Sequence, residues 1–309
     1  MIITKKAHIL FAITILGNNS ALPAFGRNPT SQILQTNDNS FLIDCGEGTQ
    51  IQMSKYKIKH SKISHIFISH LHGDHYFGLI GLLTSMSLLN REHDLHLFGP
   101  PQLKEIIDIQ LRVADTVLNF DLHFHPLLTE GEICNTNKMT ISTFKVQHQI
   151  DCWGFLFKEK KNPRSIDIEK AKAFEIPASF YDNLQKGDNY ITKKGTLINN
   201  ESVTVAAPPP KTYAYCADTL FDKSLVEKVR GVHLLYHEST YLKDLEDRAA
   251  SRYHSTTTQA ATIAKMAEVK QLMIGHFSSK YESIEPFLNE AKEVFENTIL
   301  AIEGSCYKI

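Results

Sequence analysis

The sequence has few cysteines and almost no net charge. Its five cysteines are widely spaced, odd in number and without CxxC pairing, which argues against a disulfide framework and indicates reduced thiols in the cytoplasm. The formal net charge of −1 gives no overall positive field that would point to nucleic acid. No stretch is long and apolar enough to span a membrane. No Pro-, Ser- and Gly-rich linker divides the 309 residues, and 42% of them are hydrophobic, which suffices for a globular core.

The N-terminus allows two interpretations. Residues 1–16 carry two lysines and then a short apolar run, a pattern that resembles a signal peptide. No small-residue cleavage site follows, and the run leads directly into Gly17-Asn18-Asn19-Ser20. We therefore predict a first buried strand over Ile9–Leu16 in preference to a signal peptide.

The densest set of metal-binding side chains lies at residues 70–75 (HLHGDH). The preceding run, residues 63–69, alternates apolar and polar residues and predicts a strand. The following run, residues 76–89, is apolar and long enough to predict a helix. The cluster thus sits at the C-terminal end of a strand, where α/β sheets usually place their chemistry.

The spacing inside this cluster suits two metal ions. His70 and His72 are two residues apart, so in extended backbone they point the same way and can bind one ion. Asp74 and His75 are offset and can reach a second, with Gly73 allowing the sharp turn between the pairs. Imidazole and carboxylate suit Zn²⁺, with Mn²⁺ or Fe²⁺ as alternatives. The competing interpretations are a surface loop that happens to hold histidines and a closed structural zinc site.

Three later residues are candidates to complete the centre: His148, Asp218 and His276 each follow a strand-like run. Taken alone, a histidine at a strand end is more often a hydrogen-bonded surface residue. Taken together they supply what two ions need, because a carboxylate has two oxygens and can bridge. The remaining strand and helix patterns form two β-rich halves, which fit a sandwich of sheets covered by helices.

These motifs resemble the metallo-β-lactamase superfamily and, within it, the short form of ribonuclease Z (tRNase Z), the tRNA 3′-processing endonuclease. The resemblance covers nearly the whole chain and includes residues 216–219 (CADT), 237–240 (HEST), 254–256 (HST) and 275–281 (GHFSSKY). It implies an α/β fold, a four-layer αβ/βα sandwich formed by a single domain over residues 1–309. It also implies a protruding helical arm, a tRNA-binding insertion at 158–195.

The resemblance assigns metal ligands residue by residue, for two zinc ions per subunit. One zinc would be held by His70, His72, His148 and Asp218. The other would be held by Asp74, His75, Asp218 and His276.

The resemblance also supports three catalytic roles. Asp74 would orient the attacking water or accept its proton. The leaving 3′ oxygen needs a proton, and His254 is the candidate general acid. Glu238 could hold the His254 imidazole in orientation, as a carboxylate does in a triad. The alternative for His254 is a loop histidine bonded to backbone.

Candidate RNA contacts lie in two places. Residues 158–194 hold nine Lys/Arg and six Asp/Glu, a local charge of +3. On charge alone this is an ordinary solvated insertion, whereas the resemblance implies an arm that grips tRNA through phosphate contacts. Arg27, with Asn28 and Ser31 near it, either contacts RNA or caps the first loop structurally. The candidate residues of the arm are Lys160, Lys161, Arg164 and Lys186.

The resulting hypothesis is a cytoplasmic zinc-dependent endoribonuclease that removes 3′ trailers from precursor tRNA. It would leave a 3′-hydroxyl on the tRNA and a 5′-phosphorylated trailer, and the resemblance implies a homodimer. The alternatives are another hydrolase of the superfamily, such as a cyclic-nucleotide phosphodiesterase or an arylsulfatase-like enzyme, and a non-catalytic RNA-binding member. Non-catalytic members usually lose ligands, and here all seven are present.

Overall fold

The computed structural model describes residues 11–309, which form two compact units. The first unit comprises residues 11–134, 141–157 and 212–309, and the second comprises 135–140 and 158–211. The first two residues of the strand expected at Ile9–Leu16 lie outside the described part, as do residues 1–10 of the signal-peptide alternative. Over residues 11–309, no helix combines the length and apolar character needed to cross a membrane.

One seven-stranded sheet of the first unit has the order β18-β1-β2-β3-β4-β5-β6. Neighbours from β18 to β3 pair antiparallel, and those from β3 to β6 pair parallel. Its strands are β1 (Phe11–Gly17), β2 (Ser31–Thr36), β3 (Ser40–Cys45), β4 (Ile63–Phe67), β5 (Leu95–Gly99), β6 (Leu122–Pro126) and β18 (Cys306–Lys308).

The other large sheet has the order β17-β16-β15-β14-β9-β8-β7. Strands β14 to β17 pair in parallel. Its strands are β7 (Gly131–Asn135), β8 (Met139–Val146), β9 (Cys152–Glu159), β14 (Thr212–Cys216), β15 (Leu234–Glu238), β16 (Gln271–Gly275) and β17 (Thr298–Leu300).

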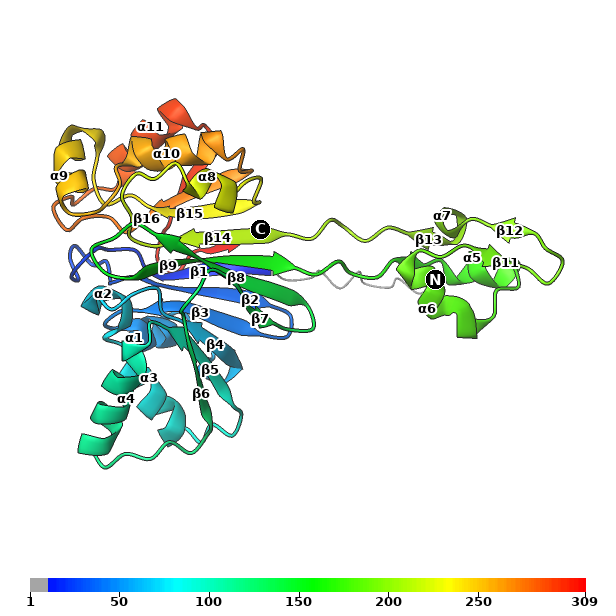
Figure 1. Ribbon diagram of the computed structural model, residues 1–309, viewed down its shortest axis with the longest axis horizontal. Coiled ribbons are helices and arrows are strands. Elements are labelled where there is room, and N and C mark those ends of the chain that lie inside the picture. The colour runs from blue at the N-terminus through cyan, green and yellow to red at the C-terminus, as the bar shows by residue number, and fades with distance from the viewer. Residues whose placement is uncertain (1–10) are drawn as a thin grey trace. The chain divides into compact units, whose positions relative to one another are not determined.

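Helices cover the outer face of each sheet, so the first unit has the four layers that the resemblance implies, and this prediction is confirmed (Figure 1). Beside the first sheet are α1 (Thr49–Lys55), α3 (Leu79–Leu88) and α4 (Gln102–Val113), and beside the second are α8 (Leu225–Lys228), α10 (Thr257–Met266) and α11 (Glu285–Val294). The shorter helices of this unit are η1 (His60–Lys62), α2 (Gly73–Tyr76), η3 (Lys243–Leu245) and α9 (Glu246–Ser251).

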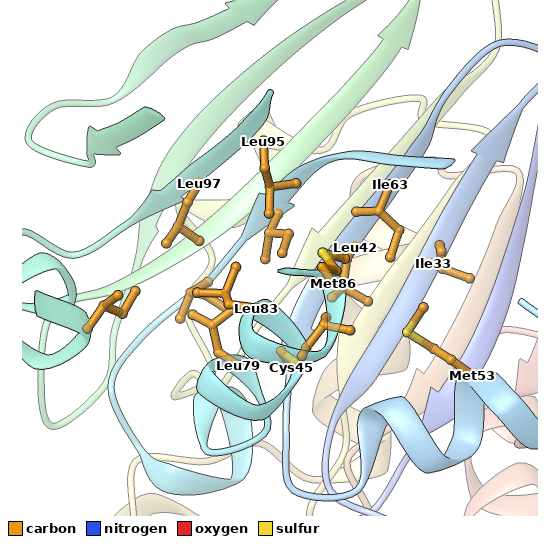
Figure 2. Close-up of a cluster of buried hydrophobic side chains, with 14 of the residues drawn as sticks. Ile33, Leu42, Cys45, Met53, Ile63, Leu79, Leu83, Met86, Leu95 and Leu97 are labelled. Atoms are coloured by element: carbon orange, nitrogen blue, oxygen red, sulfur yellow. The ribbon is translucent and has the colours of Figure 1, made fainter. Parts of the chain in front are cut away.

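Side chains on successive residues of a strand point to opposite faces of the sheet, so the first sheet contributes to two apolar layers. One face of the first sheet packs on its helices, where Leu79 and Leu83 of α3 lie near Leu95 and Leu97 of β5 (Figure 2). The opposite face meets the second sheet through aromatic rings. The Phe67 ring of β4 lies with its centroid 5.4 Å from those of Phe155 and Phe157 in β9. Neighbouring side chains on β4 thus serve different layers, as the two-residue period of a strand requires.

The helix predicted at 76–89 is interrupted. One turn, α2, ends at Tyr76, and α3 begins at Leu79. Between them, a Cβ on Gly78 would lie 2.2 Å from the Gly46 carbonyl oxygen. Only glycine allows this approach, which packs the end of β3 against the loop 70–75 region.

The second unit has its own small core. Its apolar side chains come from both ends of the insertion, because β10 (Ser165–Ile166) pairs with β13 (Thr204–Val205). The expected insertion ended at 195, whereas the compact unit extends to residue 211 and the β10–β13 pairing already includes Val205. The other elements are α5 (Ile168–Ala173), η2 (Ala178–Phe180), α6 (Tyr181–Lys186), β11 (Tyr190–Ile191), β12 (Leu197–Ile198) and α7 (Asn200–Val203). The core residues are Ile176, Leu184, Ile198 and Val203.

We expect Phe67→Ala to lower the free energy of unfolding by about 3–5 kcal/mol, because it leaves a cavity between the sheets. Ile51→Ala on α1 is the control, since Ile51 is 69% exposed and should cost no more than about 0.5 kcal/mol. Urea denaturation of both variants measures the difference. Equal midpoints would show that the aromatic layer does not hold the sheets together.

Candidate metal centre and active site

The candidate residues meet because strand ends meet. Parallel strands present their carboxyl ends at one edge of a sheet, and polar residues that follow them converge there. The loop 70–75 follows β4, His148 follows β8, Asp218 follows β14, Glu238 ends β15 and His276 follows β16.

One group of donor atoms is centred on His72. Its Nδ1 lies 3.2 Å from His70 Nε2 and 3.0 Å from His148 Nε2. Asp218 Oδ2 lies 3.7 Å from His70 Nε2 and 3.9 Å from His148 Nε2. Donors about 2.1 Å from a tetrahedral Zn²⁺ are ~3.4 Å from each other. The four side chains therefore have the spacing of one coordination shell.

A second group shares Asp218. His276 Nε2 lies 3.3 Å from both His75 Nε2 and Asp74 Oδ2, and 3.2 Å from Asp218 Oδ1. Asp218 thus offers one oxygen to each group, the arrangement of a bridging carboxylate. Its Oδ1 is buried and has no hydrogen-bond partner within the described residues. A cation between the groups satisfies that oxygen, so the donor set fits divalent metal.

The outer nitrogens of four of these histidines are held by neighbouring oxygens. Such partners fix the tautomer and leave the lone pair on the inner nitrogen. The contacts are His70 Nδ1 to Ser69 Oγ (3.0 Å), His75 Nδ1 to Asp44 Oδ2 (2.7 Å), His148 Nδ1 to Tyr253 O (2.8 Å) and His276 Nδ1 to Thr240 Oγ1 (3.0 Å).

Asp44 is the positioning residue that the sequence analysis missed. It is fully buried at the end of β3 and accepts hydrogen bonds from Tyr215 Oη, Ser69 N and Ser69 Oγ besides contacting His75. The available signal was an acidic residue ending a buried strand. That signal alone does not single out Asp44, because its partners come from three separate elements.

Negative charge at the centre favours a cation. Burial lowers the pKa of His75, but Asp218, Asp74 and Asp44 outweigh it and raise that pKa well above its ordinary value. Burial raises the pKa of Asp74, yet His75 and its other neighbours hold it below its ordinary value. A bound metal ion would take the place of the proton on His75 as the positive partner of these carboxylates.

Burial also lowers the pKa of His70, His72 and His148. The neutral imidazole is the form that binds metal. This part of the site is therefore set to ligate at neutral pH.

His254 pairs with Glu238 as predicted from the sequence. The His254 Nδ1 to Glu238 Oε1 distance is 3.0 Å, so the ring is bonded to a carboxylate and not to backbone. Glu238 is fully buried and also accepts hydrogen bonds from Ser255 N, Thr219 N and both the amide and hydroxyl of Thr240. Burial lowers the pKa of His254, but Glu238 outweighs it and raises that pKa to about 9. His254 therefore stays protonated at neutral pH.

A cleft of about 420 Å³ opens onto these groups. Asp74, Asp218 and His254 line it, and Leu22 and Phe77 lie at the same cleft with half or more of their surface exposed. The backbone N–H of Ala21 donates to Asp74 Oδ2 at 2.7 Å, so the first loop also holds a candidate catalytic carboxylate. The cleft leaves room for an extended substrate over the metal centre.

The Arg27 side chain is hydrogen-bonded to other residues of the protein. Its Nε donates to Asn19 Oδ1 at 2.8 Å, and its two Nη atoms donate to the carbonyls of Tyr281 and Glu282. It thus ties the first loop to the segment after β16, which favours the capping alternative. Its contact with RNA stays a prediction.

The other RNA-contact candidates divide similarly. Asn28 binds Glu303 and Ser31 Oγ donates to the Asp44 carbonyl, so both are engaged within the protein. In the second unit, Arg164 Nε donates to Thr204 Oγ1 at 2.7 Å. Lys160 is half-buried, whereas Lys161 and Lys186 are exposed.

Curated relatives match almost the whole chain. A ribonuclease Z from Cytophaga hutchinsonii is 46% identical over 97% of this chain and 96% of its own length. One from Bacteroides fragilis is 42% identical over 97% and 99%. The chain belongs to the ribonuclease Z family. A family model described as Anti-Pycsar protein Apyc1 also matches residues 11–172, which include the loop 70–75 and His148.

Solved structures share the fold at lower identity. The short form of human tRNase Z has a TM-score of 0.71 at 24% identity, covering 96% of this chain and 99% of that one. The metallo-β-lactamase fold protein YhfI from Bacillus subtilis has a TM-score of 0.69 at 19% identity, covering 97% and 100%. The metallo-β-lactamase fold and the clustered donors together identify a divalent-metal centre in this ribonuclease Z family member.

We expect Glu238→Gln to move the alkaline limb of the kcat–pH profile to lower pH on an RNA substrate. The candidate general acid, His254, acts in its protonated form, so activity is lost as pH rises through the pKa of His254. Removing the negative charge of Glu238 lowers that pKa. At neutral pH the loss should be roughly 10–100-fold. Bis(p-nitrophenyl) phosphate should lose far less, because p-nitrophenolate leaves without a proton.

The matched control for this variant is Glu227→Gln, an exposed glutamate paired with Arg230, which should change neither profile. Equal losses on both substrates with an unmoved profile would make Glu238 a purely structural residue.

Proposed function

We propose that this protein is a metal-dependent endoribonuclease that removes 3′ trailers from precursor tRNA. Relatives named ribonuclease Z, 40–46% identical over at least 95% of this chain, support the activity. The observation that carries the proposal is the convergence of seven side chains with nitrogen and oxygen donors, from both sheets, six of them around the shared Asp218 carboxylate. We further propose a cytoplasmic enzyme that works as a homodimer, in which the insertion of one subunit serves the site of the other.

The proposed centre holds two zinc ions per subunit, with Mn²⁺ or Fe²⁺ as alternatives. His70, His72, His148 and Asp218 would hold one, and Asp74, His75, Asp218 and His276 the other. Two such ions, when bound, lower the pKa of water and neutralise charge on a phosphodiester in the transition state.

The side chains divide the proton transfers. Asp74 orients the attacking water and accepts one of its protons, while the water oxygen bonds to phosphorus. The bond from phosphorus to the 3′ oxygen of the tRNA breaks, and His254 Nε2 gives its proton to that oxygen. Glu238 is a positioning residue, since it acts through the His254 ring. The products are a tRNA 3′-hydroxyl and a trailer with a 5′-phosphate.

Metal-analysed protein incubated with a 3′-extended tRNA and with bis(p-nitrophenyl) phosphate tests the proposal. We expect cleavage after the tRNA body with a 3′-hydroxyl at the mapped end, and loss of both activities on chelation. Asp218→Ala should bind less metal and lose at least about 100-fold in activity, since even outer-shell changes cost 10–100-fold. Hydrolysis of the small phosphodiester with no cleavage of the tRNA would instead favour another phosphodiesterase of this fold. Inactivity of metal-loaded protein on both substrates would overturn the enzyme assignment.

The insertion is proposed to grip the tRNA through phosphate contacts. Glu159 N donates to Lys211 O at 2.9 Å, and Glu159 Oε2 accepts from Lys211 N at 2.9 Å. These two residues can be joined by a two-residue Asn-Gly turn that replaces residues 160–210. We expect this deletion to raise KM for precursor tRNA at least tenfold, and to leave hydrolysis of bis(p-nitrophenyl) phosphate nearly unchanged.

A point variant separates charge from structure. Lys161→Ala/Lys186→Ala should weaken tRNA binding and flatten its salt dependence, because each lost phosphate contact reduces counterion release. The control, Lys104→Ala/Lys223→Ala in the first unit, should do neither. Equal effects of both double variants would argue against a specific role of the insertion.

A further inference from the structure

A second group of imidazoles lies on the first sheet, outside the candidate metal centre. His65, His96 and His123 occupy paired positions on β4, β5 and β6. Paired residues share a face of the sheet, and the rings stack at centroid distances of 4.9 and 5.0 Å. His125 lies two residues along β6 on the same face, stacked on Phe98 at 4.4 Å. The sheet thus aligns four histidines at its β6 edge.

Two of these rings point nitrogen to nitrogen. His96 Nδ1 lies 3.0 Å from His125 Nε2. The same separation joins His72 Nδ1 and His148 Nε2 in the candidate metal centre. Both values are close to the ~3.4 Å edge of a zinc coordination tetrahedron. The two rings can share a hydrogen bond at this distance, and the same two nitrogens are close enough to bind one ion once the shared proton is lost.

His65, His96 and His125 are neutral at neutral pH, and the neutral imidazole is the form that binds metal. Burial, with the neighbouring histidines, lowers the pKa of His96 and of His125, and lowers that of His65 to about 4. Both His96 and His125 are half-exposed, so water can reach the pair and complete a coordination shell.

Carboxylates flank the row of rings. Asp94 Oδ2 lies 2.9 Å from His123 Nε2, and donor atoms of Asp94, Asp121 and His123 lie within 4.8 Å of one another. His123 stacks on His96, so this negative charge is beside the paired rings. It would attract a cation and offset the charge of a bound ion.

We propose that His96 and His125 bind a divalent transition metal of the Zn²⁺ or Cu²⁺ class at the β6 edge of the first sheet. Imidazole nitrogens suit both ions. Strand β6 is the last strand of its sheet, and an ion held between the two rings would tie it to β5. The site is independent of the proposed nuclease activity, because none of its residues lines the cleft.

Zinc binding to tag-free holoenzyme tests the proposal. Isothermal titration with Zn²⁺ should show one site beyond those of the catalytic centre, and metal analysis should find one more zinc per chain. His96→Gln/His125→Gln should raise the Kd of the additional site at least tenfold. The control is His93→Gln, an exposed histidine in the turn before β5, which should bind zinc as the parent does. All three proteins should hydrolyse bis(p-nitrophenyl) phosphate equally.

A spectroscopic measurement covers the case in which the double variant does not fold. Cu²⁺ added to the holoenzyme should give an electron paramagnetic resonance spectrum with coupling to two imidazole nitrogens. The single variants His96→Gln and His125→Gln should each show one coupled nitrogen fewer. Unchanged zinc stoichiometry in the double variant, or unchanged nitrogen coupling in the single variants, would overturn the assignment.

Discussion

The structure depends on one constraint, the concentration of charge around the Asp218 carboxylate. Asp218, Asp74 and Asp44 lie among the five imidazoles of the candidate metal ligands, and most of these side chains are buried. Isolated buried carboxylates are costly unless they are paired or coordinate metal. Divalent cations would pair with these carboxylates and would also bind the lone pairs of the histidine nitrogens. The ligand geometry and the stability of this edge of the sandwich therefore have the same origin.

The backbone bends to meet that constraint. Asp44 and His276 both have left-handed backbone, with φ of 54° and 61°. Such conformations cost of order 1–3 kcal/mol for residues other than glycine and persist only when the surroundings fix them. Here Asp44 is held by Tyr215 of β14, by Ser69 in the loop after β4 and by His75 of α2. His276 is held by Thr240 and its neighbours in the cluster. The strained backbone at Asp44 and His276 thus directs both side chains toward the candidate metal centre.

Local signals explain what could be predicted from the sequence. The loop 70–75 and the strand-end residues His148, Asp218 and His276 were accessible, because period and residue type mark strand ends and their polar caps. Asp44 was not, since its role depends on Tyr215 and Ser69, which are distant in sequence. The break between α2 and α3 was not predicted either. At that break Gly78 approaches Gly46, a contact between distant segments that a local sequence pattern does not reveal.

The insertion and the rest of the chain carry net charges of opposite sign. The whole chain carries −1, whereas residues 158–211 contain ten Lys/Arg and seven Asp/Glu, which is +3 and leaves −4 for the rest. A polyanion such as RNA is repelled by that remainder except at a metal-loaded centre. Similar folds occur at 12–19% identity in proteins with other names, so the fold alone does not specify a large RNA as the substrate. Under the proposed function, selection of a large RNA requires residues outside the cluster, and the insertion is the segment with a positive net charge.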